Sequence, residues 1–321
     1  MTLTSRNLHV AFSDRIVAPS PNHELLVAFR FGLKPALEKH PSVVDTYLAP
    51  FDHKVMYECW WVAEHVHHHN IGKIRIAECG DYAILIQDST ENSNDELACE
   101  TQVAYCGIFT ALRSTGHSRI AKVWNYLGAI NEGDGDEERY RRFSVGRARA
   151  FAEYAIPDCA APAATGIGTR RSRGLTTITL ASRHPQYLVE NPRQTSAFRY
   201  PRQFGPSSPK FARGASVFAK DHTLQLLSGT AAIVGHDSLH PFDTKLQLQE
   251  TLRNITAINE SLPISERSSL FRVYLRNADD YEFVKDKLAS QPKIDTKQLI
   301  FLHGDICRRE LLIELDGVRV A

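Results

Sequence analysis

Glu314 is the residue whose surroundings most favour chemistry. It is the acid in the otherwise apolar run Leu-Leu-Ile-Glu-Leu-Asp, residues 311–316. In a strand, alternation places Glu314 on one face with Leu312 and Asp316. A solvated face would leave the carboxylate without a special role, whereas an apolar pocket would raise its pKa until it can donate a proton near neutral pH. The pattern alone leaves both interpretations open.

Cys307 lies shortly before that strand, in the run Asp-Ile-Cys-Arg-Arg. A lone cysteine is more often a small buried apolar residue than a nucleophile. Arg308 and Arg309 beside it would help to form a thiolate if it were reactive. The six cysteines of the chain are scattered, without a C-x-x-C pair, which is typical of reduced thiols in a cytosolic protein.

A long irregular stretch, residues 190–214, contains four prolines. Its arginines and interleaved aromatic residues are Arg193, Arg199, Arg202, Arg213, Tyr200 and Phe204. Ordered loops of this length are usually functional, and arginine binds carboxylates through paired hydrogen bonds, so we predict a clamp for a carboxylate-bearing small molecule. Such residues can also bind single-stranded nucleic acid. The balance of 38 basic against 37 acidic residues argues against that partner.

No motif in the sequence indicates a cofactor or a metal. The histidine cluster at residues 65–69 lacks a cysteine or carboxylate at a spacing that completes a tetrahedral site, and we expect a polar loop there. There is no Walker motif, G-x-G-x-x-G or G-x-S-x-G. The N-terminus has no apolar signal region, and no apolar run is long enough for a bilayer. We expect a cytoplasmic protein without cofactors that does not bind membranes.

The order of the expected elements predicts the fold class. Strands or short buried segments are expected at residues 25–32, 54–62, 74–88 and 98–112. Strands are expected at 175–183, 215–220, 224–234, 268–277, 298–304 and 309–320, and helices at 117–133, 138–156, 244–262 and 279–290. In the C-terminal part this order favours an α+β fold with helices on one face of a mixed sheet. A run rich in Pro, Ala and Gly, residues 159–174, is the candidate boundary between an N-terminal domain, 1–155, and a C-terminal catalytic domain, 156–321.

Three runs resemble the RidA (YjgF-like) superfamily, which has a chorismate mutase-like fold. They are residues 226–238, LLSGTAAIVGHDS, residues 248–258, LQETLRNITAI, and the closing strand, residues 311–317, with Glu314 on the functional glutamate of the superfamily. The resemblance implies a RidA-like C-terminal module and, by analogy, a degenerate one in the N-terminal half. Leu299 stands where the superfamily usually has an arginine, which argues against RidA-type imine deamination.

More of the chain resembles the chorismatases, RidA-like enzymes that hydrolyse chorismate. The matching blocks are residues 124–133, WNYLGAINEG; 138–151, ERYRRFSVGRARAF; 162–168, PAATGIG; 190–214; 228–236, SGTAAIVGH; and 305–315, DICRRELLIEL. The resemblance implies that Glu314, held protonated, gives its proton to the methylene carbon of the enolpyruvyl ether, after which pyruvate leaves. The substrate-binding residues it implies are Arg147, Arg193, Tyr200, Arg202, Arg213, Thr230, Ala231 and Ala232.

The resemblance also bears on the product. Hydroxybenzoate-forming chorismatases are similar to this chain in having cysteine at position 307, so we expect 3-hydroxybenzoate, alone or with 4-hydroxybenzoate, and a product-steering role for Cys307. Ala231 does not fully match that pattern. A chorismatase that forms a dihydroxylated cyclohexadiene carboxylate, an imine deaminase and a non-catalytic binding module are the alternatives. We expect a small-molecule substrate, and a monomer or a trimer.

Overall fold

The computed structural model describes residues 2–36, 40–91, 93–262, 269–291 and 294–321. Its first sheet is N-terminal and has five strands in the order β1-β2-β6-β3-β4. Their bounds, in that order, are Thr2–Thr4, Leu8–Ser13, Met56–Val62, Glu24–Phe31 and Val43–Asp45. The β3–β4 pair is parallel and the others are antiparallel.

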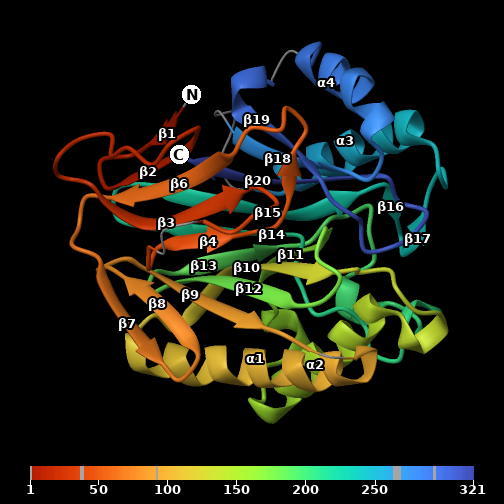
Figure 1. Ribbon diagram of the computed structural model, residues 1–321, viewed down its shortest axis with the longest axis horizontal. Helices are drawn as coiled ribbons and strands as arrows, with labels where there is room; N and C mark the ends of the chain where they lie inside the picture. The colour runs from red at the N-terminus through yellow and green to blue at the C-terminus, as the bar shows by residue number, and fades with distance from the viewer. Residues whose placement is uncertain (1, 37–39, 92, 263–268, 292–293) are drawn as a thin grey trace.

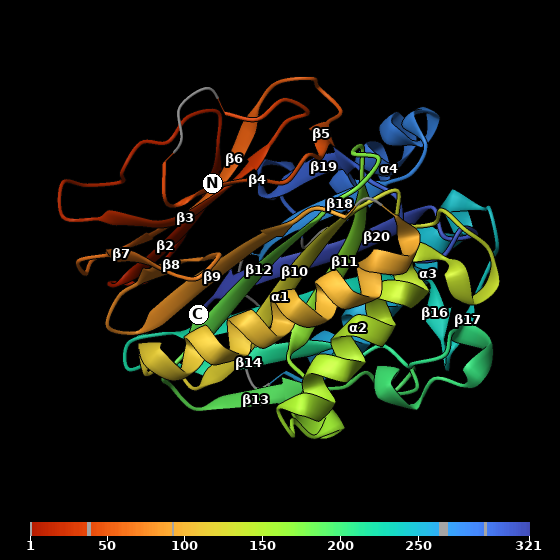
Figure 2. The ribbon, with the colours of Figure 1, turned by 60° about the horizontal axis from the view of Figure 1, so that its bottom comes forward.

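The second sheet has six strands in the order β11-β10-β12-β9-β8-β7. Their bounds are Ala163–Thr169, Arg119–Gly128, Leu175–Ser182, Tyr82–Ser89, Ile74–Glu78 and His67–Ile71. Helices α1, Asn94–Thr115, and α2, Arg139–Glu153, run side by side across its outer face (Figures 1 and 2). Only β10 and β11 pair in parallel, so this sheet is mixed.

The third sheet has seven strands in the order β13-β14-β15-β20-β18-β19-β5. Their bounds are Gln186–Val189, Gly214–Phe218, Thr223–Ala231, Ile313–Val320, Ser269–Leu275, Leu299–His303 and Ala49–Pro50. Helices α3, Thr244–Glu260, and α4, Tyr281–Ala289, lie together on its outer side (Figure 1). A short hairpin, β16 at Ile233–Val234 and β17 at Asp237–Ser238, follows β15.

The inner faces of the three sheets share one core. Trp124 of β10, Phe29 of β3 and Tyr274 of β18 all belong to it and are fully buried. The opposite faces pack on helices: Val123 of β10 lies under α1 and α2, and Leu315 of β20 lies under α3 and α4. The expected α+β fold class, with mixed sheets covered by helices on one face, is therefore confirmed.

Two element predictions in the first half are wrong. Residues 98–112 form part of α1, whose buried residues Leu97, Ile108 and Leu112 recur at helical spacing and which ends at Gly116 in the left-handed conformation that glycine favours. Residues 119–128, expected as a helix, form β10. This strand is buried on both faces, so its apolar residues show no alternation by which to recognise it.

Smaller differences concern single residues. The histidine cluster, expected as a polar loop, lies partly in β7, an exposed strand at the sheet edge. Of the apolar residues along α3, Ile255 and Ile258 are buried, Leu252 is half-buried and Leu246 is exposed. No helix in the described ranges is long and apolar enough to cross a membrane.

The sheets do not divide at the boundary predicted between residues 155 and 156. Strands β11 and β12 lie beyond that point in sequence, yet they complete the six-stranded sheet of the first half. In the other direction, β5 at residues 49–50 adds to the edge of the C-terminal sheet next to β19. The position of the domain boundary stays a prediction, but secondary structure crosses it in both directions.

Candidate active site

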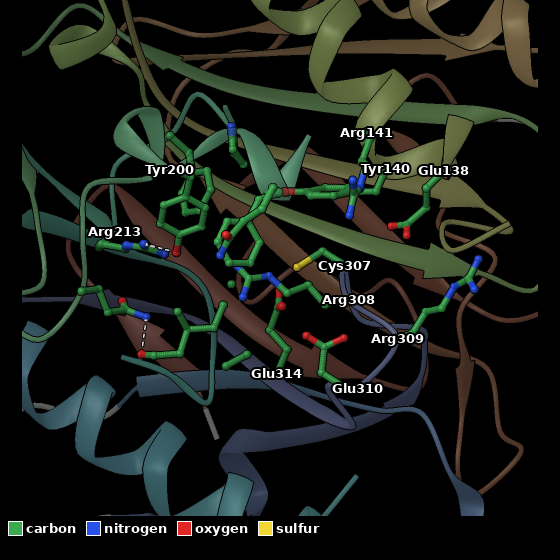
Figure 3. Close-up of a pocket in the computed structure, with 18 residues that line it drawn as sticks. Glu138, Tyr140, Arg141, Tyr200, Arg213, Cys307, Arg308, Arg309, Glu310 and Glu314 are labelled. Atoms are coloured by element: carbon green, nitrogen blue, oxygen red, sulfur yellow. Dashed lines mark hydrogen bonds between the residues drawn. The ribbon is translucent and has the colours of Figure 1, made fainter. Parts of the chain in front are cut away.

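A cavity of about 220 Å³ opens beside the start of β20. Figure 3 shows its lining, which combines acidic, basic and aromatic side chains. They come from the start of α2, the irregular stretch at 194–213, the end of β15 with the following Ile233, and the segment from Cys307 to Glu314. The lining residues are Glu138, Tyr140, Arg141, Gln194, Tyr200, Gln203, Phe204, Pro209, Phe211, Arg213, Gly229, Ala231, Ile233, Cys307, Arg308, Arg309, Glu310 and Glu314.

Glu314 is a buried acid in the wall of this cavity. Its side chain belongs to the inner face of β20 and only 4% of the residue is exposed. Burial raises the pKa of Glu314 to about 8, and the negative charge of Asp316 adds to the rise, while Lys122 and Arg213 oppose it. The sequence left open whether Glu314 lies on a solvated face or in an apolar pocket. The structure places it on a buried face. A carboxyl of this kind is protonated at neutral pH and can donate a proton.

Gly229 of β15 gives the Glu314 carboxyl its space. A Cβ atom at position 229 would collide with the carboxyl group of Glu314. The register shift in the pairing of β15 with β20, between Leu227 and Thr230, falls at this point. Bulges of this kind often lie beside active sites because they change the direction of a side chain. Here the irregularity lets the acid occupy the wall of the cavity.

Arg213 and Tyr200 form the cationic side of the cavity and lie together in Figure 3. Arg213 is 3% exposed; its Nη2 donates to the Tyr200 hydroxyl at 2.8 Å and to the Thr195 carbonyl at 2.9 Å, while its Nε has no partner within the described residues. A buried guanidinium with a free N–H is suited to an anionic ligand.

Arg308 also lines this cavity. Its guanidinium stacks on the Phe204 ring at 4.0 Å and lies 5.4 Å from the Tyr200 ring centre. Its Nη1 donates to the Ser238 hydroxyl at 3.0 Å, and that hydroxyl donates to Glu310 at 2.6 Å. The aromatic residues thus hold a second cation next to the ligand space.

Arg147 of α2 borders a second, smaller cavity of about 30 Å³. The two cavities share Glu314, Cys307 and Gly229 in their walls. Arg147 is 3% exposed, and within the described residues its Nε and Nη2 have no hydrogen-bond partner and no carboxylate pairs with it. Burying an unpaired charge costs several kcal/mol, so this arrangement is typical of a site that a ligand anion completes.

Cys307 lies between the two cavities as an uncharged thiol. Burial raises the pKa of Cys307 to about 12, and the nearby Glu314 adds to the rise. A thiol in this state is not a nucleophile at neutral pH. Its contribution to the site is therefore its size and apolar character.

Relatives of known function were found by sequence. A family profile described as "Chorismatase FkbO/Hyg5-like, N-terminal" matches residues 58–181, a range that crosses the predicted domain boundary. A 3-hydroxybenzoate synthase of Streptomyces hygroscopicus is 34% identical over 68% of both chains. A chorismatase of Streptomyces rapamycinicus is 33% identical over 69% of this chain and 70% of its own. The chain belongs to the chorismatase family.

A solved structure agrees with the membership in that family. The crystal structure of a chorismatase superposes with a TM-score of 0.86 at 26% identity, and the superposition covers 99% of each chain. The expected family and its fold are therefore confirmed, and so is an enzyme that acts on a small molecule, as chorismatases do.

Not all of the residues predicted for the site of this chorismatase lie at its cavities. Glu314, Cys307, Tyr200, Arg213 and Ala231 line the larger cavity and Arg147 the smaller one. Arg193, Arg202, Thr230 and Ala232 are outside the lining of both among the described residues.

Arg193 and Arg202, which lie outside the lining of both cavities, have other partners. Arg193 is ion-paired with Glu250 and donates to Asn254 Oδ1 at 2.7 Å. Arg202 is largely exposed and pairs with Asp136, its Nη1 donating at 2.9 Å. A loop rich in arginine therefore indicated the right region, but the sequence could not say which guanidinium groups keep free N–H donors.

Sequence reasoning gave no role at the site to several lining residues. Tyr140 and Arg141 come from the start of α2, and Phe211 belongs to the irregular stretch. The first two lie in the 138–151 block that carried the family resemblance, so that block was a usable signal. Gly229 lies in the 228–236 block of the same resemblance, but its role could not be predicted there, because it depends on the approach of a strand that is distant in sequence.

Proposed function

We propose that this enzyme cleaves the enolpyruvyl ether of chorismate and releases pyruvate and 3-hydroxybenzoate. The observation that carries the proposal is the buried, protonated Glu314 in a cavity bordered by guanidinium groups with free N–H donors. A relative of similar sequence is named as a 3-hydroxybenzoate synthase. The free state of all six cysteines supports the reducing cytoplasm as its compartment.

The two carboxylates of chorismate have separate partners in this proposal. The enolpyruvyl carboxylate enters the small cavity and binds Arg147, because that cavity adjoins Glu314 and the carbon to be protonated belongs to the same three-carbon unit. The ring carboxylate binds Arg213, whose orientation is fixed by Tyr200. Two fixed ion pairs hold the methylene carbon at the acid, and such positioning supplies a large part of enzymatic rate enhancement.

The reaction begins when the Glu314 carboxyl donates its proton to the methylene carbon. The ether oxygen then carries positive charge, and its bond to the ring carbon breaks as pyruvate leaves with its new methyl group. The neighbouring ring hydroxyl captures that ring carbon and forms a protonated epoxide. The bond between this oxygen and its original ring carbon then breaks, and the carbon that now carries the hydroxyl loses its proton to the Glu314 carboxylate, which gives 3-hydroxybenzoate. Chorismate has the same atoms as pyruvate and 3-hydroxybenzoate together, so no water is consumed and Glu314 regains its proton.

Cys307 directs the outcome in this proposal. Its uncharged thiol lies in the walls of both cavities, where it occupies space that a water molecule would need to reach the ring carbon. Capture by water instead would give the dihydroxylated diene. Ala231, also in the lining, leaves room for the ring.

Incubation with chorismate, followed by chromatography of the products and an assay for pyruvate, tests the proposal. We expect equal amounts of pyruvate and 3-hydroxybenzoate from the wild type. Glu314→Gln should lower kcat by about 10²–10⁴-fold, the usual contribution of a general acid, while a chorismate analogue still binds. Unchanged turnover by Glu314→Gln would refute the mechanism, and ammonia release from 2-aminoacrylate without pyruvate release from chorismate would favour an imine deaminase.

A further inference from the structure

A second buried carboxylate, Asp316, lies behind the acid on the same face of β20. Two residues along a strand span about 6.6 Å, so the two carboxyl groups are near neighbours. Asp316 Oδ2 accepts hydrogen bonds from Lys122 Nζ at 3.1 Å, Trp124 Nε1 at 3.1 Å and Thr165 Oγ1 at 2.7 Å. The proposed reaction assigns no step to Asp316, which is 1% exposed and lies outside the described lining of both cavities.

Thr165 of β11 connects Asp316 to the cavity wall. Its hydroxyl donates to Asp316 and accepts from the backbone N–H of Gly229 at 3.1 Å. Gly229 in turn lies against the Glu314 carboxyl. A continuous series of contacts therefore runs from the buried carboxylate to the acid that faces the cavity.

The two carboxyl groups have opposite environments. Burial alone would raise the pKa of Asp316, but Lys122 and Arg272 with the Thr165 hydrogen bond hold it below its usual value. Arg272 Nη1 lies 3.6 Å from Asp316 Oδ2. Neighbouring titratable groups that differ in this way divide into a charged member and a protonated member.

We propose that Asp316, Lys122 and Thr165 are positioning residues for Glu314. The charge on Asp316 keeps its neighbour protonated, Lys122 limits that effect, and Thr165 fixes the wall against which the Glu314 carboxyl rests. The inference rests on the proposed function, because it concerns the acid of that reaction. Asp316 and Lys122 lie outside the described lining of both cavities, whereas Thr165 lines the smaller one and acts on Glu314 through Gly229 and Asp316.

Other charged and titratable groups also surround Glu314, and every variant below retains them. They are Arg213, Tyr200, Tyr140, Arg147, Tyr274, Cys307, Arg308 and Glu310. A difference in pH dependence between variants at positions 122 and 316 therefore shows the effect of the charges at those two positions.

The test is the pH dependence of pyruvate release from chorismate by the wild type, Asp316→Asn, Lys122→Met and the double variant. Removing the Asp316 charge makes Glu314 ionise more easily, so the upper inflection of kcat should move to lower pH by about one unit. Removing the Lys122 charge should move it to higher pH, and the double variant should resemble the wild type. Shifts of opposite sign cannot come from general loss of structure. An inflection that stays in place in both folded single variants overturns the proposal.

Two further measurements keep the test decisive if a variant does not fold or if chorismate is not the substrate. If Asp316→Asn does not fold, the double variant compared with Lys122→Met supplies the same difference, and an equal inflection in the two refutes the role of Asp316. Titration of ¹³C-labelled glutamate carboxyl groups by NMR, with Glu314→Gln to identify the signal, reports the same shifts without turnover. A wild type inactive on chorismate therefore refutes the proposed function while leaving this inference open to its own result.

Thr165 has a matched pair of variants. Thr165→Val keeps the volume and removes the hydroxyl, and we expect a lower kcat with little change in KM. Thr165→Ser retains the hydroxyl and should restore most of the loss. Equal kcat values for Thr165→Val and the wild type would contradict the positioning role of Thr165.

Discussion

Glu314 and Asp316 show how the surroundings of a buried carboxyl group determine its protonation state. The same strand face carries Glu314 and Asp316, both nearly inaccessible to solvent. Lys122 and Thr165 bond to Asp316, whereas Glu314 faces a cavity. The difference in partners, rather than in the carboxyl group itself, lowers the pKa of Asp316 and raises the pKa of Glu314, as the proposed proton donation requires.

The protonated state of Glu314 predicts a pH profile. Because burial and Asp316 raise the pKa of Glu314 to about 8, the acid is protonated below that pH and loses its proton above it. Activity should therefore persist through neutral pH and fall as pH rises through about 8. The kcat/KM of pyruvate release, measured from pH 4 to 10, checks this for the free enzyme. A profile that declines already between pH 4 and 5 would show an ordinary carboxyl.

Cys307 should affect the product more than the rate. Cys307→Ala removes a half-buried thiol from the wall of both cavities and leaves room for water near the ring carbon. We expect a shift from 3-hydroxybenzoate towards the diene, measured by chromatography. Cys99→Ala, at an exposed position of α1, is the matched control and should leave the product ratio unchanged. The same ratio for Cys307→Ala would contradict product steering.

Arg147 should show the signature of a binding residue. Arg147→Met removes an ionic hydrogen bond to the substrate, worth about 1.5–3 kcal/mol, and kcat/KM should fall roughly 10- to 100-fold. The melting temperature of Arg147→Met should equal or exceed that of the wild type, because within the described residues no carboxylate pairs with the buried Arg147 charge in the free enzyme. Arg149→Met, exposed on the same helix, should change neither quantity. Loss of stability together with activity would instead indicate a structural role.

At the scale of elements, the sequence predicted the amphipathic helices best. Helices α2, α3 and α4 were recognised by their period. Strands β14, β15, β18, β19 and β20 of the C-terminal sheet were also expected, whereas β13 and β5 of that sheet were not. The failures were β10, which is buried on both faces, and α1, whose cysteines, valine and aromatic residues resemble a strand. At the site, Glu314 and Arg213 were predicted from their motifs. Gly229 and Thr165 lie in matching blocks too, but their roles depend on contacts between distant strands, which the sequence does not show.

The packing of α1 on α2 supplies a prediction at this scale. Gly146 of α2 allows the helices to approach so closely that a Cβ atom there would collide with the Ala98 carbonyl. Gly146→Ala should therefore lower the free energy of unfolding by about 1–3 kcal/mol despite the better helix propensity of alanine, as for other overpacked sites. Thermal unfolding measures the loss. Arg149→Ala is the exposed control, and a more stable Gly146→Ala would show that the helices can separate without cost.

At the scale of the molecule, the three sheets meet at a group of buried charges. Arg272 of β18 pairs with Glu58 of β6, its Nε and Nη2 donating at 2.7 and 2.8 Å. Its guanidinium also stacks on Phe29 at 4.3 Å and on Trp124 of β10 at 5.0 Å. One side chain therefore contacts all three sheets, and the strand that carries Glu314 lies directly beside it, paired with β18.

This junction should dominate the stability of the whole chain. Arg272→Met leaves Glu58 buried without its partner, and we expect a loss of about 3–5 kcal/mol in unfolding free energy, measured by urea denaturation. Adding Glu58→Gln removes the orphaned charge and should recover part of that loss, so the two changes are not additive. Arg15→Ala, which breaks an exposed ion pair with Asp14, should have no measurable effect. Additive losses at positions 58 and 272 would mean that the pair does not join the sheets, and that packing alone holds β18 and its neighbour β20 in place.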